Sequence, residues 1–178
     1  AGLAAQIRAK MNSLVDEDII RALYEAARAG VKVQLNVRGI CCLRPGLKGP
    51  SDGIEVVSVV DRFLEHSRIF HFSNGGDEEV YLSSADWMPR NLDRRIELLF
   101  PVLSPEGREK ALAALDAAFA DNVKARRLQS DGSYKRRRPG RGEEPWRSQL
   151  ELHRETKRAL ERARAGLAVA FEPIRAPE

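Results

Sequence analysis

The sequence is poor in cysteine and lacks any long hydrophobic run, and both absences narrow the class of protein. Its 178 residues include only two cysteines, the adjacent Cys41 and Cys42. Adjacent cysteines rarely bridge each other, and two thiols supply neither a disulfide framework nor a four-ligand zinc site. We therefore predict buried, reduced thiols in a cytoplasmic protein. No run approaches the roughly 18 apolar residues of a membrane span, so any membrane contact would be peripheral, at the inner face.

An initiator methionine is also missing, because the chain begins Ala1-Gly2-Leu3. We expect the sequence to be a piece of a longer protein, whose targeting signals would lie upstream. A hydrophobic content of 43% and a charged content of 31% are typical of a soluble globular protein, and the length suits one domain with extensions.

Positive charge is concentrated in the C-terminal third. Residues 124–164 hold 14 Lys and Arg against 6 Asp and Glu, a net charge of +8, whereas the whole chain carries only +4. A basic segment beside a mildly acidic body indicates a polyanion nearby, and a solvated basic tail explains the charge equally well. The four cations Lys135–Arg138 therefore have two readings, as a guide for a polyanion and as solubilising surface.

Apolar periodicity predicts an α/β fold. A strand at 6–11, a helix capped by Asp16 and stopped at Gly30, and a strand at 31–37 form a βαβ unit with parallel pairing. Further strands are predicted at 54–60, 69–72, 80–82 and 96–101, with a hairpin turn at Asn74–Asp77 and a covering helix at 105–122.

The chain changes character after Leu128. Residues 129–145 are rich in Gly, Arg, Pro and Ser, which predicts a flexible or externally docked basic segment. Residues 146–178 are predicted to be a polar helical tail, helical over 146–165, of the kind that faces solvent or a partner. We accordingly divide the chain into a domain over 1–128, the basic segment and the tail.

Polar residues gather between residues 61 and 97, at the ends of two short predicted strands. His66 and Arg68 are two positions apart, so in an extended segment they point to the same face, and Ser84 and Asp86 repeat this spacing. Such a pocket can bind phosphate oxygens and manage one proton, because the pKa of histidine suits that task.

Arg38 follows another predicted strand directly, where ligands of α/β sheets bind. Its planar fork suits phosphate oxygens, and Gly39 would let the backbone approach a bound group. We expect the other histidines, His71 and His153, to be a structural and a surface residue. Apolar residues near the polar stretch are expected to be core residues rather than ligand contacts: Phe63, Leu64, Trp87, Met88 and Phe100.

The polar stretch resembles a half-site of the phospholipase D superfamily, which reads His-x-Lys, a few residues to an Asp, then Gly-Ser-x-Asn. The counterparts are His66-Ser67-Arg68 and Ser83-Ser84-Ala85-Asp86. Arg replaces Lys, Ser replaces Gly and Asp replaces Asn, and the spacing is longer. The resemblance implies a phospholipase D-like mixed sheet flanked by helices, with the polar helix as a C-terminal extension.

Longer runs are similar to the C-terminal domain of bacterial polyphosphate kinase of the first type, over about 2–149. The matching runs are KMNSLVD (10–16), VRGICCLRPG (37–46), RFLEHSR (62–68), NGGDEEVYLSSADWMPRNLDRRIE (74–97) and DNVKAR (121–126). The resemblance implies reversible transfer of the terminal phosphate of ATP to inorganic polyphosphate, through a phosphohistidine. It also implies homo-oligomers and an active-site tunnel formed together with the preceding domains.

The resemblance also assigns roles to individual residues. Arg38, His66 and Arg95 match ATP-binding positions, and His66 and Glu97 are the candidate catalytic groups, with Glu97 as a carboxylate that could orient an imidazole. Groups expected to line the phosphate pocket are Arg68, Ser84, Asp86, Arg90 and Asn91. No metal ligand is assigned to this chain.

Nothing in the sequence matches the family's phosphorylated histidine, which belongs to the preceding domain, as do the residues that contact Mg²⁺. We therefore expect the chain to be inactive alone, with ATP or ADP and polyphosphate as ligands and no specific nucleic acid. Two other functions are left open. One is a phospholipase D-type phosphodiesterase that dimerises through His66, and the other is a polyanion-binding module that uses the basic tail.

Overall fold

The structure is a computed structural model that describes residues 2–167. Its helices and strands follow one another in the order β1 (Ala5–Met11), α1 (Glu17–Arg28), β2 (Lys32–Val37), β3 (Ile54–Val59), β4 (Arg68–Asn74), β5 (Asp77–Ser83), α2 (Pro89–Arg94), β6 (Leu99–Pro101), α3 (Pro105–Ala120), β7 (Ala125–Leu128), β8 (Tyr134–Arg136) and α4 (Ser148–Leu167).

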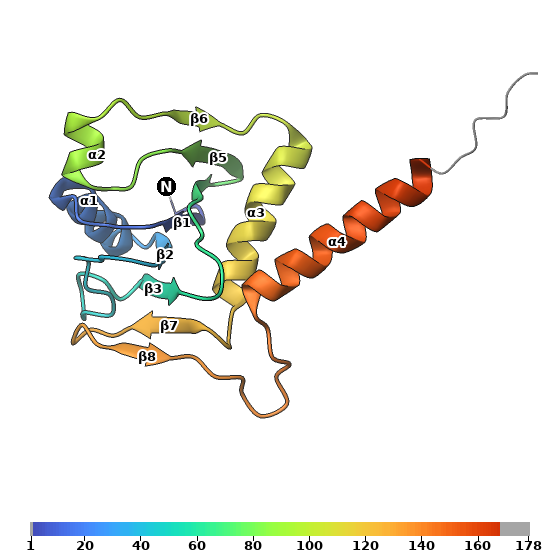
Figure 1. Cartoon of the computed structure of the whole chain (residues 1–178). Helices are drawn as coiled ribbons and strands as arrows, with labels where there is room; N and C mark the ends of the chain where they lie inside the picture. Colours follow the sequence, from blue (N-terminus) through green and yellow to red (C-terminus); the bar gives the residue numbers. More distant parts are fainter. Residues whose placement is uncertain (1, 168–178) are drawn as a thin grey trace, which may run out of the picture.

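One mixed sheet of eight strands holds the domain together, in the order β6-β5-β4-β1-β2-β3-β7-β8 (Figure 1). The central strands β1, β2 and β3 are parallel, and every other pairing in the sheet is antiparallel. The predicted βαβ unit is therefore confirmed as β1-α1-β2. β4 pairs with β1 on the side opposite β2. The strands β4, β1, β2 and β3 therefore form the middle of the sheet.

Helices cover both faces of the sheet. On one face, Ile20 and Leu23 of α1 pack against a buried row of β2 that includes Val33 and Leu35. On the other face, the α3 residue Leu115 packs against β4 and β5. Helix α1 starts as predicted, because the Asp16 carboxylate accepts a hydrogen bond from the backbone N–H of Ile19 (3.0 Å).

The predicted hairpin turn lies between β4 and β5. Gly75 and Gly76 both have positive φ, 62° and 109°, which suits a two-residue turn between twisted antiparallel strands.

Several apolar residues that were expected in the core are exposed. Phe63 is 59% exposed, Leu64 77% and Phe100 50%. Ile96 is fully exposed, and β6 is accordingly limited to Leu99–Pro101 instead of running from residue 96. The physical reason is position: Phe100 lies on the edge strand β6, Ile96 lies between α2 and β6, and Phe63 and Leu64 lie on the β3–β4 loop, outside the two buried clusters of the core. Cys41 is half-buried but Cys42 is exposed, so only the prediction of free thiols is confirmed.

The C-terminal third is more ordered than its composition predicts. β7 and β8, which were not predicted, extend the sheet as an antiparallel pair, and β8 lies within the segment expected to be flexible or docked. α4 agrees with the predicted polar helix, and it projects from the body of the domain (Figure 1). The rest of the predicted tail, 168–178, lies outside the described residues. Within residues 2–167, no helix is long and apolar enough to cross a bilayer.

Asp121 fixes the start of α4 on the domain. Its fully buried carboxylate accepts hydrogen bonds from the backbone N–H groups of Val123, Lys124 and Ala125, and from both the backbone N–H and the hydroxyl of Ser148. Burial alone would raise the pKa of Asp121, but these donors outweigh burial and lower it.

Candidate functional site

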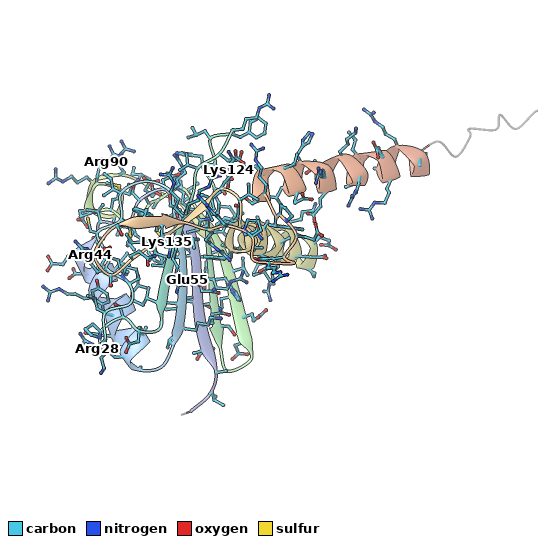
Figure 2. The ribbon with its side chains drawn as sticks, turned by 90° about the horizontal axis from the view of Figure 1, so that it is seen from below. Arg28, Arg44, Glu55, Arg90, Lys124 and Lys135 are labelled. Atoms are coloured by element: carbon cyan, nitrogen blue, oxygen red, sulfur yellow. The ribbon has the colours of Figure 1, made fainter. Side chains whose placement is uncertain are left out.

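The topology brings the candidate residues to one end of the sheet. Asn12 follows β1 and Arg38 follows β2, and the antiparallel β4 begins at the same end with Arg68. β5 runs back to this end, where Ser84 and Asp86 follow it. Figure 2 shows Arg90 and Lys124 toward this end and Arg28, at the end of α1, toward the other.

A buried ion pair between Arg68 and Asp86 forms the centre of the site. Nε of Arg68 donates to Oδ1 of Asp86 (3.1 Å), and a terminal nitrogen donates to Oδ2 (3.0 Å). The two residues are only 8% and 6% exposed. Burial raises the pKa of Asp86, but the Arg68 guanidinium and the donors of Asn12 together hold the pKa below its usual value. The pair is therefore ionised.

Asn12 links this ion pair to Arg38. Its backbone N–H donates to Oδ1 of Asp86 (2.7 Å), its side-chain amide donates to Oδ2 (3.2 Å), and its Oδ1 accepts from Nε of Arg38 (2.7 Å). Asn12 is buried, and sequence reasoning missed it. A signal was present, because Asn12 follows β1 directly, as Arg38 follows the adjacent parallel strand β2.

His66 completes the chain of contacts on the other side of the ion pair. A terminal nitrogen of Arg68 lies 3.0 Å from Nδ1 of His66 and also donates to the His66 carbonyl (2.9 Å). Because a guanidinium can only donate, Nδ1 must accept, and the neutral ring then carries its proton on Nε2. His66 is exposed. The structure thus orients the imidazole with a donor on its outer nitrogen.

Two further contacts hold the loop that carries His66. Lys10, which is buried at the end of β1, forms a salt bridge with Glu65 (3.0 Å) and donates to the hydroxyl of Ser67 (2.9 Å). From α4, the Gln149 side chain donates to Glu65 (2.9 Å) and to the carbonyl of Phe63, and accepts from the Phe63 backbone N–H (both 2.8 Å). The polar tail therefore braces the loop of the candidate histidine.

Glu97 belongs to a neighbouring group with Ser84 and Asn91. The Ser84 hydroxyl and the Asn91 amide both donate to its carboxylate, and the Ser84 donor first, then the Asn91 donor, lower the pKa of Glu97. Among the described residues, no hydrogen bond joins Glu97 to His66, whose ring instead contacts Arg68. Glu97 therefore does not orient the imidazole of His66 in this structure.

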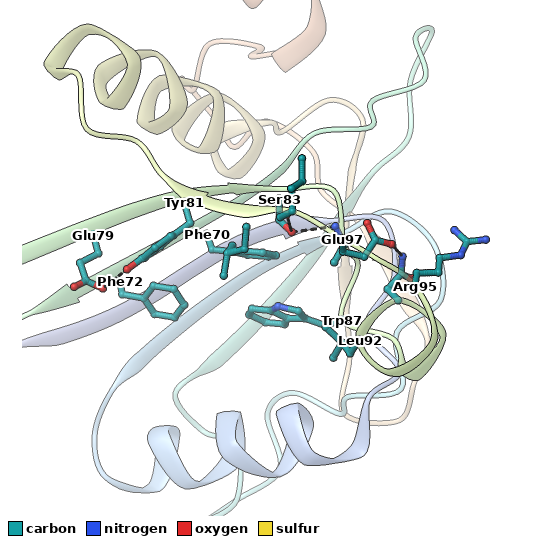
Figure 3. A pocket seen from close by; sticks show the side chains of 13 residues that line it. Phe70, Phe72, Glu79, Tyr81, Ser83, Trp87, Leu92, Arg95 and Glu97 are labelled. Atoms are coloured by element: carbon teal, nitrogen blue, oxygen red, sulfur yellow. Dashed lines mark hydrogen bonds between the residues drawn. The ribbon is translucent and has the colours of Figure 1, made fainter.

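The two predicted ATP-binding arginines face different cavities. Arg95 borders an open cavity of about 630 Å³ lined by aromatic and aliphatic side chains, whereas Arg38 borders a second cavity of about 380 Å³. In the first cavity Phe70 and Trp87 stack with ring centroids 4.8 Å apart, and the Arg95 side chain extends away from the rings (Figure 3). Arg90 is exposed on α2.

The side chains near the site do not fit a magnesium ion. Among residues 2–167, no group of three or more His, Cys, Asp and Glu side chains could hold a metal ion. The two nearby carboxylates, Asp86 and Glu97, already accept hydrogen bonds from protein donors.

The fold first defines a class. Nuc from Salmonella typhimurium, a phospholipase D family member, superposes with a TM-score of 0.54 at 18% identity, covering 72% of this chain and 85% of Nuc. The predicted phospholipase D-like α/β fold, a mixed sheet flanked by helices, is thereby confirmed.

Sequence similarity then defines the family. The model of the family described as polyphosphate kinase C-terminal domain 2 matches residues 1–149, and the chain belongs to this family. The polyphosphate kinase of Rhodopirellula baltica is 54% identical over 165 residues, covering 93% of this chain and 19% of that protein. The crystal structure of polyphosphate kinase from Porphyromonas gingivalis matches with a TM-score of 0.85 and 44% identity, covering 90% of this chain and 24% of that one. The chain thus spans about a fifth to a quarter of these relatives.

Proposed function

We propose that this chain forms one wall of the active site of a polyphosphate kinase, which reversibly transfers the terminal phosphate of ATP to inorganic polyphosphate. The observation that carries the proposal is the continuous set of contacts Arg38–Asn12–Asp86–Arg68–His66 at one end of the sheet. It places two arginines and an imidazole donor side by side, within a chain that belongs to the polyphosphate kinase family.

Each residue of this set has a distinct task in the proposed reaction. Phosphoryl transfer depends mainly on positioning and on neutralising the charge of the transferred group. Among the described residues, the Arg38 guanidinium is bound through Nε to Asn12, and its terminal nitrogens are left for phosphate oxygens. His66, held at Nδ1 by Arg68, offers Nε2–H as a hydrogen-bond donor to a phosphate oxygen, where it stabilises the negative charge of the transferred group. Asp86 and Asn12 are positioning residues.

The remaining groups extend the proposed wall. Arg95 supplies a cation beside the open cavity, and Glu97 is fixed there by Ser84 and Asn91. The phosphorylated histidine and the Mg²⁺ contacts of the reaction are proposed to come from other parts of the enzyme, which acts as a cytoplasmic homo-oligomer on ATP or ADP. With only one wall of the site, we expect the isolated chain to form no acid-insoluble polyphosphate from ATP above the level of a His66→Ala variant.

Calorimetric titration of the chain with ATP–Mg²⁺ and with tripolyphosphate tests the proposal. Arg38→Ala removes a charged guanidinium donor, and His66→Ala removes the N–H donor of the ring. We expect each substitution to weaken the binding of both ligands by about tenfold or more. The matched controls are Arg28→Ala, at the opposite end of the sheet, and His153→Ala, on the exposed face of α4. These controls should bind as the parent chain does.

Other outcomes would reject the assignment. Binding that survives both pocket variants but disappears when residues 130–178 are removed would show that the basic C-terminal part of the chain is the contact. Hydrolysis of bis-(p-nitrophenyl) phosphate that depends on His66 would favour a phosphodiesterase of the phospholipase D class.

A further inference from the structure

A basic cavity lies beside the site, toward the β8 edge of the sheet. It has a volume of about 380 Å³, about a dozen times the share of one water molecule in the liquid. Its lining consists of four cations and four other residues: Arg38, Lys124, Arg126, Arg136, Gly39, Ser58, Val60 and Tyr134. No carboxylate is among these lining residues. We call this group the basic cavity.

The cations of the basic cavity are only partly compensated. Arg136 donates through two nitrogens to the Val123 carbonyl (3.2 and 3.0 Å), a contact that orients the side chain without cancelling its charge. Lys124 lies 3.7 Å from Asp61, whose carboxylate already accepts two hydrogen bonds from Arg147 (both 2.7 Å). Positive charge gathered around a cavity without lining carboxylates attracts an anion.

The sheet itself spaces these cations. Ser58 of β3 pairs with Arg126 of β7, which pairs in turn with Arg136 of β8, so the three side chains share one face. Tyr134 is two residues before Arg136 and lies on that same face. From β2, which positions Arg38, to β8 there are three strand spacings, or about 14 Å. The charge is thus spread in a row across neighbouring strands.

We propose that the basic cavity binds successive phosphate groups of an extended polyphosphate chain, outside the phosphate that reaches His66. This inference rests on the proposed function and deepens it. A row of cations across three strands matches a ligand with regularly repeated charge, whereas a compact triphosphate would need its cations around one point. Arg38 borders both the cavity and the contacts of the site, so it connects the two.

The chain offers a matched pair of residues for the test. Arg126 is exposed and faces the basic cavity, whereas Lys135 is exposed on the same hairpin but alternates to the other face of β8. Replacing either one removes one positive charge from the same edge of the sheet. Because both side chains are exposed, neither substitution should impair folding.

Binding of tripolyphosphate and of a long-chain polyphosphate is measured for the parent chain, Arg126→Gln, Arg126→Glu and Lys135→Gln. We expect Arg126→Gln to weaken long-chain binding by about 3- to 10-fold, Arg126→Glu to weaken it further, and both to leave tripolyphosphate binding within about twofold. The slope of log affinity against log salt for the long chain should fall by about 1 in Arg126→Gln. Lys135→Gln should bind both ligands as the parent does.

The inference is overturned if Arg126→Glu binds the long chain as tightly as the parent, or if Lys135→Gln weakens it equally, which would indicate general surface charge. It is also overturned if single-stranded DNA of equal charge competes as well and is equally sensitive to Arg126. Failure of the proposed function looks different, because then Arg38→Ala and His66→Ala would leave ATP and tripolyphosphate binding unchanged.

Discussion

Two groups of charged residues share one end of the sheet, and they are built in opposite ways. In the contacts around Arg68 and Asp86 the charges are paired, buried and saturated with hydrogen bonds. In the basic cavity the cations are half-buried or exposed, and no carboxylate lines the cavity. Fully paired charges fix geometry but attract little, whereas partly compensated charges attract anions. The comparison indicates that one group holds His66 in place and the other receives a polyanion.

The largest expected effect is on stability, when the buried pair is broken. Asp86→Asn leaves the buried Arg68 guanidinium without its counter-charge, and an uncompensated buried charge typically lowers the free energy of unfolding by about 3–5 kcal/mol. Arg126→Gln in the basic cavity should change it by no more than about 0.5 kcal/mol. Urea unfolding followed by circular dichroism measures both. Equal effects of the two substitutions would contradict the contrast between the groups.

A smaller effect is expected where the tail braces the His66 loop. Gln149→Ala removes three hydrogen bonds to Phe63 and Glu65, and we expect a loss of about 1–3 kcal/mol in the free energy of unfolding. Because the loop is then less restrained, trypsin should cleave faster after the exposed Arg62 in the native protein.

The control for this brace is Glu155→Ala, a substitution of an exposed residue further along α4. It should leave both the stability and the cleavage rate at Arg62 unchanged. If Gln149→Ala cleaves no faster than this control, the tail does not hold the loop.

The parts of the fold that depend on local sequence were predictable. The apolar alternation of β2, the Asp16 cap of α1 and the turn at Gly75 each result from residues close together in the chain. The polar stretch was also recognised, and the structure brings His66, Arg68 and Asp86 together as spacing suggested. The catalytic and binding roles assigned to the candidate residues stay predictions.

The missed features depend on contacts between distant segments. Asn12 touches Asp86 across 74 positions, and Gln149 touches Phe63 across 86, distances at which no periodicity carries information. β7 has only Ala125 and Leu128 buried, with two exposed arginines between them, so its strand pattern is hidden among basic residues. Gly39 also has a packing role that the sequence did not reveal, because a Cβ there would lie 2.8 Å from the Asn12 carbonyl oxygen. Its expected role in admitting a ligand stays a prediction.

His71 provides a third case for the comparison. It is buried like the ion pair, but among the described residues no counter-charge would stabilise its protonated ring as closely as Asp86 stabilises Arg68. It is 4% exposed, and Glu78, Arg8 and Asp116 are the charged groups around it, with Glu78 at 3.6 Å from Nε2. Burial is the main cause that lowers the pKa of His71 below 6.5, so the folded protein keeps the ring neutral. The unfolded chain takes up this proton more readily, and stability should therefore fall as the pH drops below about 6.5 toward the lowered pKa.

The expected slope is at most about 1.4 kcal/mol per pH unit, between about pH 6.5 and the lowered pKa of the folded state. Urea unfolding at about pH 7.5 and about pH 5.5 measures it, in a range where Asp86 and Asp121, whose pKa values are lowered, stay ionised in both states. His71→Phe should reduce the difference between the two pH values, whereas His153→Gln on the exposed face of α4 should preserve it. If His71→Phe shows the same loss of unfolding free energy between the two pH values as the parent chain, another group causes that loss. The burial of His71 then does not set the acid sensitivity of this domain.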